Sequence, residues 1–299
     1  MSFVISNKQY LAPTEERIQY EPMVFEEDGV TIQKLEVGFG HPLYTTAADI
    51  LYIESNSTSS RYLPVIPDGC MALVFRRCKS NEEPAEGFLC GTIDEVKRLC
   101  LDPDGYYVFI RFMPGTGYSL IKNGKYANRI SDIAVPIKGG VAGEEQMLSV
   151  LERDLPFAER LGLISKIVRV NLQNEPDRYI VKYCTDRIFK SQGNVKVEEL
   201  AKETGFTSRH IGKIFERCVG VSPKLYSQII KLQTSMNEII GSDKPLMEIA
   251  MDSGFFDHAH MNRMYKKFIK ISTGEFRKTL FTKLDYELLE DYISVSEEQ

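Results

Sequence analysis

Histidine is scarce in this 299-residue chain, which has four, and residues 1–181 contain one of them, His41. A metal-dependent enzyme built on a β-barrel needs several histidines and a carboxylate around one ion. The chain also lacks a G-x-S-x-G motif and a glycine-rich phosphate loop, the motifs of common hydrolases and nucleotide-binding enzymes. We therefore expect no metal site, no cofactor and no enzymatic activity.

Long apolar runs and paired cysteines are also missing. No run reaches the roughly 20 residues that span a bilayer, and the first residues lack the basic and apolar segments of a signal peptide. The six cysteines form no C-x-x-C pair, and Cys70, Cys78, Cys90 and Cys100 match no zinc-binding spacing that we know. We expect a cytoplasmic protein with reduced, structural thiols and no membrane partner.

Positive charge is confined to one part of the chain, whose net charge is −5. Residues 182–283 contain 18 Lys and Arg against 11 Asp and Glu. Residues 1–181 contain 19 against 25, and residues 284–299 contain none against 6. A basic segment in an otherwise acidic chain indicates where a polyanion binds, although an ordinary solvated surface is the alternative.

Residues 198–278 contain one pattern written twice. The first copy reads EELAKETGFTSRHIGKIFER and the second MEIAMDSGFFDHAHMNRMYKK. Ala201 and Gly205 correspond to Ala250 and Gly254 at an offset of 49, which becomes 50 after the turn because the second copy has one extra residue.

Each copy has the pattern of a helix-turn-helix unit. The small Ala lets a second helix cross closely, and the Gly accepts the left-handed backbone that ends the first helix. The second helix carries an apolar stripe at spacings of three and four, which packs inward and leaves a polar face for a major groove. The stripe consists of Ile211, Ile214 and Phe215 in the first copy and of Met261, Met264 and Tyr265 in the second.

These features resemble the C-terminal DNA-binding domain of the AraC/XylS family of bacterial transcription regulators, in which a long helix joins two helix-turn-helix units. The resemblance covers residues 176–280. The run GFFDHAHMNRMYKK follows the family's G-F-x-(D/S)-x-x-x-F-x-R-x-F-(K/R)-(K/R), with Met261 and Tyr265 at its two aromatic positions. The resemblance implies duplex DNA as partner, RNA polymerase as a further partner of an activator, and a homodimer as assembly.

Two departures from the family pattern stand out. The family follows each second helix with Gly-x-(S/T)-Pro, which residues 220–223 keep and residues 270–273, KIST, do not. The connecting helix, which we expect to begin at Ser222 and Pro223, carries Lys224 and Lys231 where the family has several arginines. We therefore expect fewer phosphate contacts than is usual.

The polar faces of the two second helices supply the candidate DNA contacts. Arg209, Lys213 and Arg263 fall where such helices meet bases, and Arg or Lys there can bond guanine. His258 and His260 do not share a helix face, which disfavours zinc and favours DNA contact. Arg217, Lys266 and Lys267 are expected to contact the DNA backbone or to make no contact with DNA. The expected DNA-binding residues are Ser208, Arg209, His210, Lys213, Arg217, His258, His260, Asn262, Arg263, Lys266 and Lys267.

The first part of the chain reads as β-structure, with short apolar runs separated by turns such as Pro67-Asp68-Gly69. Such spacing predicts a cupin-like β-barrel or sandwich. RYLPVIPDGCMALVF and VFIRFMPG resemble the sensor region of one AraC subgroup, whose P-D-G and R-F-x-P-G motifs hold the fold together. The overall prediction is an α+β chain with a β-rich sensor domain, a helical linker and an all-α domain with two helix-turn-helix units.

Residues 144–172 predict two helices with apolar stripes. These stripes either cover the β domain or form a dimer interface, and the pattern does not distinguish the two. The expected segments are a β-rich sensor domain at 1–140, a helical linker or dimerisation segment at 141–175, the DNA-binding domain at 176–283 and an acidic tail at 284–299.

Aromatic and arginine side chains in the β region suggest a ligand site, because alternation along a strand turns some of them inward. A small, partly apolar and anionic effector fits such a lining. The alternatives are an effector-free DNA-binding module controlled by abundance or a protein partner, and an enzyme fused to a DNA-binding domain. The candidate effector residues are Tyr44, Tyr52, Tyr62, Arg76, Tyr107 and Arg111.

Overall fold

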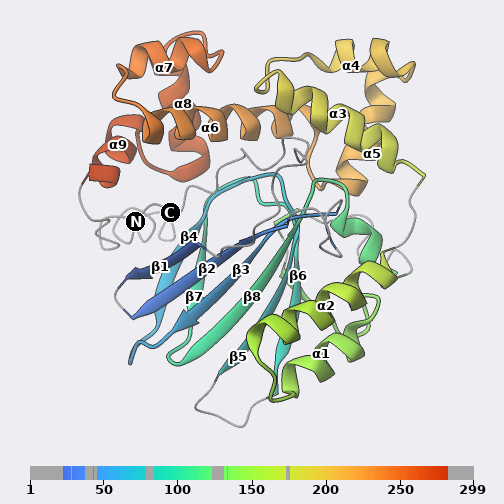
Figure 1. Cartoon of the computed structure of the whole chain (residues 1–299). Coiled ribbons are helices and arrows are strands. Elements are labelled where there is room, and N and C mark those ends of the chain that lie inside the picture. Colours follow the sequence, from blue (N-terminus) through green and yellow to red (C-terminus); the bar gives the residue numbers. More distant parts are fainter. Residues whose placement is uncertain are drawn as a thin grey trace, which may run out of the picture.

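The structure is a computed structural model, which describes residues 23–27, 29–37, 43, 46–78, 84–122, 131–132, 134–172 and 176–281. It has the α+β architecture that the sequence predicts, with a β domain, a helical pair and a helical domain in chain order. Figure 1 shows the helical domain lying across one end of the strands, with the helical pair against one face of the sheet. His41, Tyr44 and the segment 284–299 lie outside the described residues.

The β domain contains two antiparallel sheets. The larger has the order β1-β2-β3-β8-β5-β6-β9, and β4 pairs with β7 in the smaller. Leu63 of β4 and Leu101 of β7 share a core with Ile32, Ile53 and Tyr107 of the larger sheet. Of the two predicted architectures, the described strands therefore form a sandwich. They are β1 (Met23–Glu27), β2 (Val30–Glu36), β3 (Ala47–Ser55), β4 (Arg61–Val65), β5 (Ala72–Cys78), β6 (Glu86–Cys90), β7 (Lys97–Leu101), β8 (Gly105–Phe112) and β9 (Ala134–Pro136).

The helical pair covers the other face of the larger sheet. α1 (Glu144–Glu152) and α2 (Phe157–Asn171) bury their apolar stripes, including Met147 and Ile164, in one core with Leu73 of β5 and Ile110 of β8. Each such buried side chain contributes roughly 1.5–3 kcal/mol. In this structure the two stripes therefore cover the sheet.

The helical domain consists of two three-helix groups joined by one long helix. The first residue of α6 is Pro223, and the preceding Ser222 is its N-cap, whose side chain accepts a hydrogen bond from the Leu225 amide. This arrangement confirms the predicted start of the helix. Each group has its own core, and the groups lie at opposite ends of α6 (Figure 1). The helices are α3 (Arg178–Lys190), α4 (Val197–Thr204), α5 (Ser208–Cys218), α6 (Pro223–Gly241), α7 (Leu246–Asp252), α8 (His258–Ile269) and α9 (Thr273–Phe281).

The Pro67-Asp68-Gly69 turn joins the two domains. The Pro67 carbonyl accepts a 2.6 Å hydrogen bond from Gln233 Nε2 of α6, and both groups are buried. Gly69 has φ +78°, and a Cβ at this position would lie 2.5 Å from the ring of Tyr226 on α6. The turn therefore needs glycine both for its backbone conformation and for close packing against α6.

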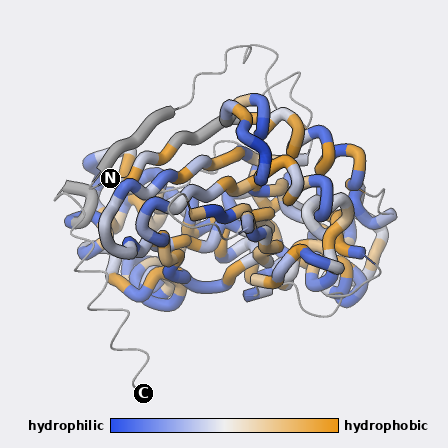
Figure 2. Tube along the Cα trace, turned by 90° about the horizontal axis from the view of Figure 1, so that it is seen from below, coloured by the Kyte–Doolittle hydropathy of each residue, from blue (hydrophilic) through white to orange (hydrophobic). Residues whose placement is uncertain are grey.

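Hydrophilic and hydrophobic stretches alternate along the trace of both domains (Figure 2). Among the described helices, none is both long and apolar enough to cross a membrane.

Candidate nucleic-acid interface

The first helix-turn-helix unit consists of α4 and α5. Gly205, with φ +74°, ends α4 in the left-handed conformation, as its place in the repeat predicts. Thr207 then caps α5, its side chain accepting a 3.2 Å hydrogen bond from the His210 amide. The predicted stripe is buried, with Ile211 and Phe215 fully inaccessible. Burial of this stripe fixes which face of α5 remains in solvent.

The second unit repeats this construction in α7 and α8. Gly254 also has φ +74°, and the Asp257 side chain accepts a 2.6 Å hydrogen bond from the His260 amide at the start of α8. Met261 and Tyr265 are fully buried. The two sequence copies therefore predict the two structural units correctly, including the left-handed glycines and the buried stripes.

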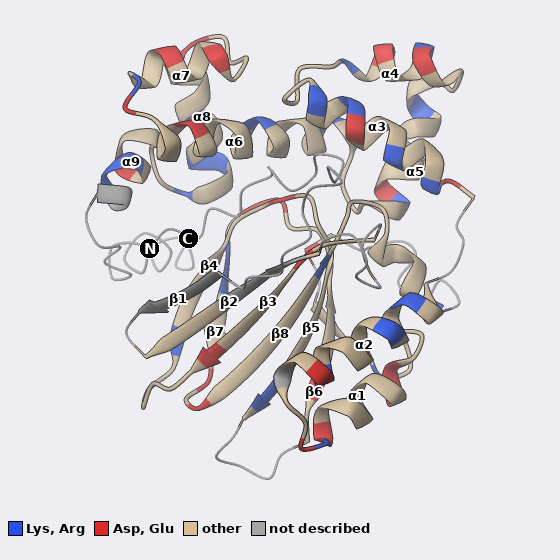
Figure 3. Cartoon of the chain, viewed as in Figure 1, with Lys and Arg blue, Asp and Glu red and all other residues tan. Residues whose placement is uncertain are grey.

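The exposed faces of α5 and α8 are basic. Arg209 and Lys213 are exposed on α5, and Arg263 and Lys266 on α8. Within the part of the chain that the structure describes, these four side chains form no ion pair, unlike many cations elsewhere in the helical domain. Figure 3 shows where the basic and acidic positions lie along these helices. Unpaired cations on a rigid, capped helix are available to phosphates and base edges.

Several other residues predicted to contact DNA have partners within the protein. Lys267 Nζ lies 3.3 Å from Gln228 Oε1, Arg217 pairs with Asp177, and the His210 ring stacks on Phe206. His260 and the half-buried Ser208 lie in the first turns of their helices. The Nδ1 atom of His260 accepts a 3.4 Å hydrogen bond from the Phe256 amide.

His258 and Asn262 hold α9 against α8. His258 Nε2 lies 2.8 Å from Thr273 Oγ1, and Asn262 Oδ1 accepts a 3.0 Å hydrogen bond from the Thr273 amide. Proline at position 273, where the family pattern places it, has no amide to donate. Ser272 and Glu275 complete a capping box at the start of α9, with mutual hydrogen bonds of 3.1 and 2.7 Å. The departure from the family pattern at residues 270–273 therefore has a structural reason, which is the hydrogen bond that the Thr273 amide donates to Asn262.

A cavity of about 470 Å³ lies between the two sheets of the β domain. Its lining is mostly apolar, with Val74, Phe88, Leu99 and Phe109 among the contributing side chains. Burial raises the pKa of Cys90, which also lines it, to about 11. That thiol therefore stays protonated at neutral pH and presents an apolar surface.

The structure divides the candidate effector residues between two faces. Arg76, Tyr107 and Arg111 line the cavity. Tyr52 instead packs on the face that α2 covers, where its hydroxyl donates a 3.2 Å hydrogen bond to Glu54. Tyr62 is 41% exposed and stacks under Arg98. Neither tyrosine reaches the cavity.

Arg111 is held by two buried carboxylates. Its guanidinium donates to both oxygens of Asp49 and, at 2.5 Å, to Oδ2 of Asp68 in the Pro67-Asp68-Gly69 turn. Burial opposes the charged guanidinium, yet Asp49 and Asp68 raise the pKa of Arg111 well above its ordinary value. The R-F-x-P-G and P-D-G motifs are therefore joined by the ion pair of Arg111 and Asp68. Arg111 thus connects the cavity wall with the Pro67-Asp68-Gly69 turn, which packs against α6.

Sequence reasoning missed Lys97 and Arg98 of β7, which contribute cations to the cavity wall. The alternation of Tyr107, Phe109 and Arg111 along β8 did carry a signal, because residues two apart share a face. Nothing in the sequence of β7 indicates which strand lies across from it.

Comparison with known proteins supports the interpretation of the helical domain as a helix-turn-helix domain. Residues 200–279 match a family described as a helix-turn-helix domain, and residues 43–132 match a domain of unknown function, DUF6597. The lactose operon transcription activator of Staphylococcus xylosus is 26% identical over 110 residues, which are 37% of this chain and 38% of that protein. The HTH-type transcriptional regulator ArgR of Pseudomonas aeruginosa is 23% identical over 154 residues, 46% of each chain.

The chain thus spans less than half the length of these two relatives.

Among solved structures, ToxT from Vibrio cholerae O395 aligns with 80% of this chain and 98% of its own, at 14% identity and a TM-score of 0.40. Residues 200–279 are thus identified as a helix-turn-helix domain.

Proposed function

We propose that this protein is a transcription regulator that binds duplex DNA with α5 and α8 as its two recognition helices. The observation that carries the proposal is the repeated construction of two capped helices, each with a buried apolar stripe and an exposed, unpaired basic face. α6 has 19 residues, so it holds the two units about 28 Å apart along its axis. This length is comparable with the roughly 34–36 Å between successive major grooves on one face of a duplex.

The exposed cations divide into readers and clamps. Arg209, Lys213 and Arg263 are assigned to base edges, where a bidentate contact to guanine gives sequence preference. Lys266 and Lys267 are assigned to phosphates, which give affinity without sequence preference. His258 and Asn262 are assigned to the support of α9 instead, because His258 Nε2 and Asn262 Oδ1 contact Thr273.

Anisotropy titrations of the full-length protein test this function. A duplex enriched by selection from a random pool serves as the specific probe, and the unselected pool as the reference. Arg263→Ala is expected to weaken specific binding by about 1–3 kcal/mol and leave pool binding nearly unchanged. Lys267→Ala is expected to weaken both by a similar factor.

Lys138→Ala, which removes an exposed cation of the β domain, is the matched control and leaves both affinities unchanged. Binding falls as salt rises, because Lys and Arg displace counterions. No enrichment of any duplex, or equal losses for all three variants, contradicts the proposal.

The cavity in the β domain supports control by a small molecule. Its volume falls in the roughly 300–1,000 Å³ range of ligand sites, and its apolar wall with Arg76, Lys97 and Arg98 suits a partly apolar anion. The relatives named above are regulators of an operon or of transcription. An activator of this kind would in addition contact RNA polymerase, and dimerisation would place two chains on one promoter.

A metabolite library screened by thermal shift, followed by DNA titration, tests the effector. A ligand of the cavity is expected to raise the unfolding temperature of the full-length protein and change its DNA affinity severalfold. Val74→Phe, which fills the cavity from β5, abolishes both effects and retains DNA binding. Hits that act equally on Val74→Phe bind elsewhere, and a screen without hits favours the effector-free module.

A further inference from the structure

The loop between β6 and β7, residues 91–96, contacts the end of each recognition helix. Thr92 Oγ1 donates a 2.5 Å hydrogen bond to the carbonyl of Val219, which caps the C-terminus of α5. Four residues later, the Val96 amide donates a 2.7 Å hydrogen bond to the carbonyl of Phe268 in the last turn of α8. Helix ends leave their last carbonyls without intrahelical partners, and here one short loop satisfies a carbonyl of each helix.

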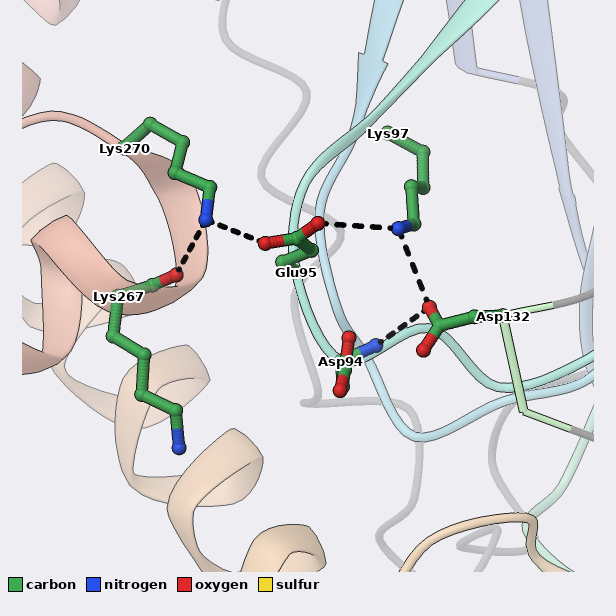
Figure 4. Close-up of polar contacts among 6 residues, drawn as sticks. All are labelled: Asp94, Glu95, Lys97, Asp132, Lys267 and Lys270. Atoms are coloured by element: carbon green, nitrogen blue, oxygen red, sulfur yellow. Dashed lines mark hydrogen bonds and ion pairs between the residues drawn. The ribbon is translucent and has the colours of Figure 1, made fainter. Parts of the chain in front are cut away.

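Lys270 adds an ion pair at the α8 end of this loop. Its Nζ lies 2.5 Å from Glu95 Oε2, and this ammonium also donates to the Lys267 carbonyl at 3.3 Å (Figure 4). Lys270 has φ +63°, a left-handed conformation that costs free energy for a side chain with a Cβ. The first copy has Gly220 at this place, with φ +93°.

The same loop borders the cavity. Gly91 and Ile93 line it, whereas Thr92 and Val96 face the helices. Lys97 also lines the cavity, and its Nζ lies 3.3 Å from Glu95 Oε1 and 3.5 Å from Asp132 Oδ1. Figure 4 shows the resulting chain of charges from Lys97 through Glu95 to Lys270.

We propose that residues 91–97 form a clasp that fixes both recognition helices on the β domain and couples their placement to the cavity through Lys97. A ligand anion that pairs with Lys97 withdraws it from Glu95 and Asp132, and Glu95 then loses the cation that orients its carboxylate towards Lys270. The clasp also explains Lys270, because the ion pair compensates for the strained backbone that glycine avoids in the first copy. The coupling rests on the proposed effector site, whereas the clasp itself does not.

Hydrogen exchange of the Val96 amide in the full-length, DNA-free protein measures the clasp directly. Lys270→Gly removes the ammonium and suits the left-handed backbone, so it leaves α8 folded. A partly exposed ion pair shifts an equilibrium on the order of twofold to fivefold, and Val96 exchange is expected to rise by that factor. The Ile110 amide, in the centre of the large sheet, is the control and stays unchanged.

Two further variants separate the clasp from an indirect effect. Glu95→Gln raises Val96 exchange like Lys270→Gly, and the double variant Glu95→Gln with Lys270→Gly raises it no further than the larger single effect. Unchanged Val96 exchange in both single variants, or additive increases in the double variant, overturns the clasp.

Lys97→Met tests the link to the cavity. It keeps an apolar stem in the wall and removes the ammonium that orients Glu95, so Val96 exchange is expected to rise. Wild-type exchange in Lys97→Met overturns the coupling and leaves the Lys270–Glu95 contact in place. None of these measurements requires DNA or a ligand, so failure of the proposed function would leave their results intact.

Discussion

Arg111 is the residue on which the β domain depends most directly. Its guanidinium is 7% exposed and bonds Asp49 and Asp68, which are also buried. Removing one partner from a buried ion pair leaves the others unpaired in a poorly solvated site, at a cost of about 3–5 kcal/mol.

Arg111→Met is therefore expected to lower the free energy of unfolding of the β domain by about 3–5 kcal/mol. Tyrosine fluorescence during urea unfolding reports it, since the chain has no tryptophan. Arg76→Met removes partly exposed pairs with Glu86 and Asp102 and is expected to cost less than the Arg111 variant, about 1 kcal/mol. Similar losses for both variants would mean that burial of the Arg111 cluster does not set its contribution.

The Glu203 carboxyl on α4 is held by two side chains of α3. Hydrogen bonds from Arg187 and Tyr183 of α3 lower the pKa of this α4 carboxyl from 4.5 to about 2. Because the folded pKa lies below the unfolded one, the contact stabilises the α3–α4 packing above pH 4.5 and is lost as the pH falls towards 2.

Carbon-detected NMR titration of the Glu203 carboxyl measures this pKa. Arg187→Gln is expected to raise it towards the ordinary value. An ordinary pKa in the wild type would show that the ion pair does not form in solution.

Alternation along a strand told us which residues share a face, but it did not tell us which face turns inward. Tyr107 and Arg111 line the cavity, whereas Tyr52 lies on the face that α2 covers. That choice depends on which face the helical pair occupies. No pattern in β3 contains this information.

At the scale of helices and strands, most of the correct predictions came from the sequence repeat in residues 198–278. Its glycines and apolar stripes are local signals, and each occurs in the structure where the spacing predicts it. The KIST segment could not be interpreted in this way, because its compensation comes from Asn262, eleven residues away, and from Glu95 in the other domain.

Two glycines with the same backbone conformation allow close packing to be separated from backbone strain. Gly205 has φ +74°, and a Cβ there would meet no neighbouring group within 4 Å, whereas Gly69 has φ +78° and the Tyr226 ring at 2.5 Å. Gly205→Ala is expected to cost about 1 kcal/mol for backbone strain alone. Gly69→Ala adds a clash with α6 and costs at least twice as much.

Thermal unfolding compares the two variants. Gly69→Ala should also raise exchange of amides in the Pro67-Asp68-Gly69 turn, because it separates the turn from Tyr226. Equal shifts in unfolding temperature would contradict tight packing between the two domains.

For the whole molecule, the sequence predicted the two kinds of domain but not how they meet. The contacts between them use Thr92, Glu95 and Gln233, which are ordinary polar residues on loops and on α6. Such contacts leave no periodicity in the sequence. Their consequence is that α5 and α8 are fixed relative to a cavity whose lining residues lie more than a hundred positions earlier in the chain.

The central claim is that α5 and α8 enter two successive major grooves of one duplex. Hydroxyl-radical footprinting of the full-length protein on its selected duplex measures this most directly. We predict two protected stretches on one face, with centres about 10–10.5 base pairs apart. Arg209→Ala should weaken one stretch and Arg263→Ala the other. A single protected stretch, or loss of the same stretch in both variants, would contradict the account.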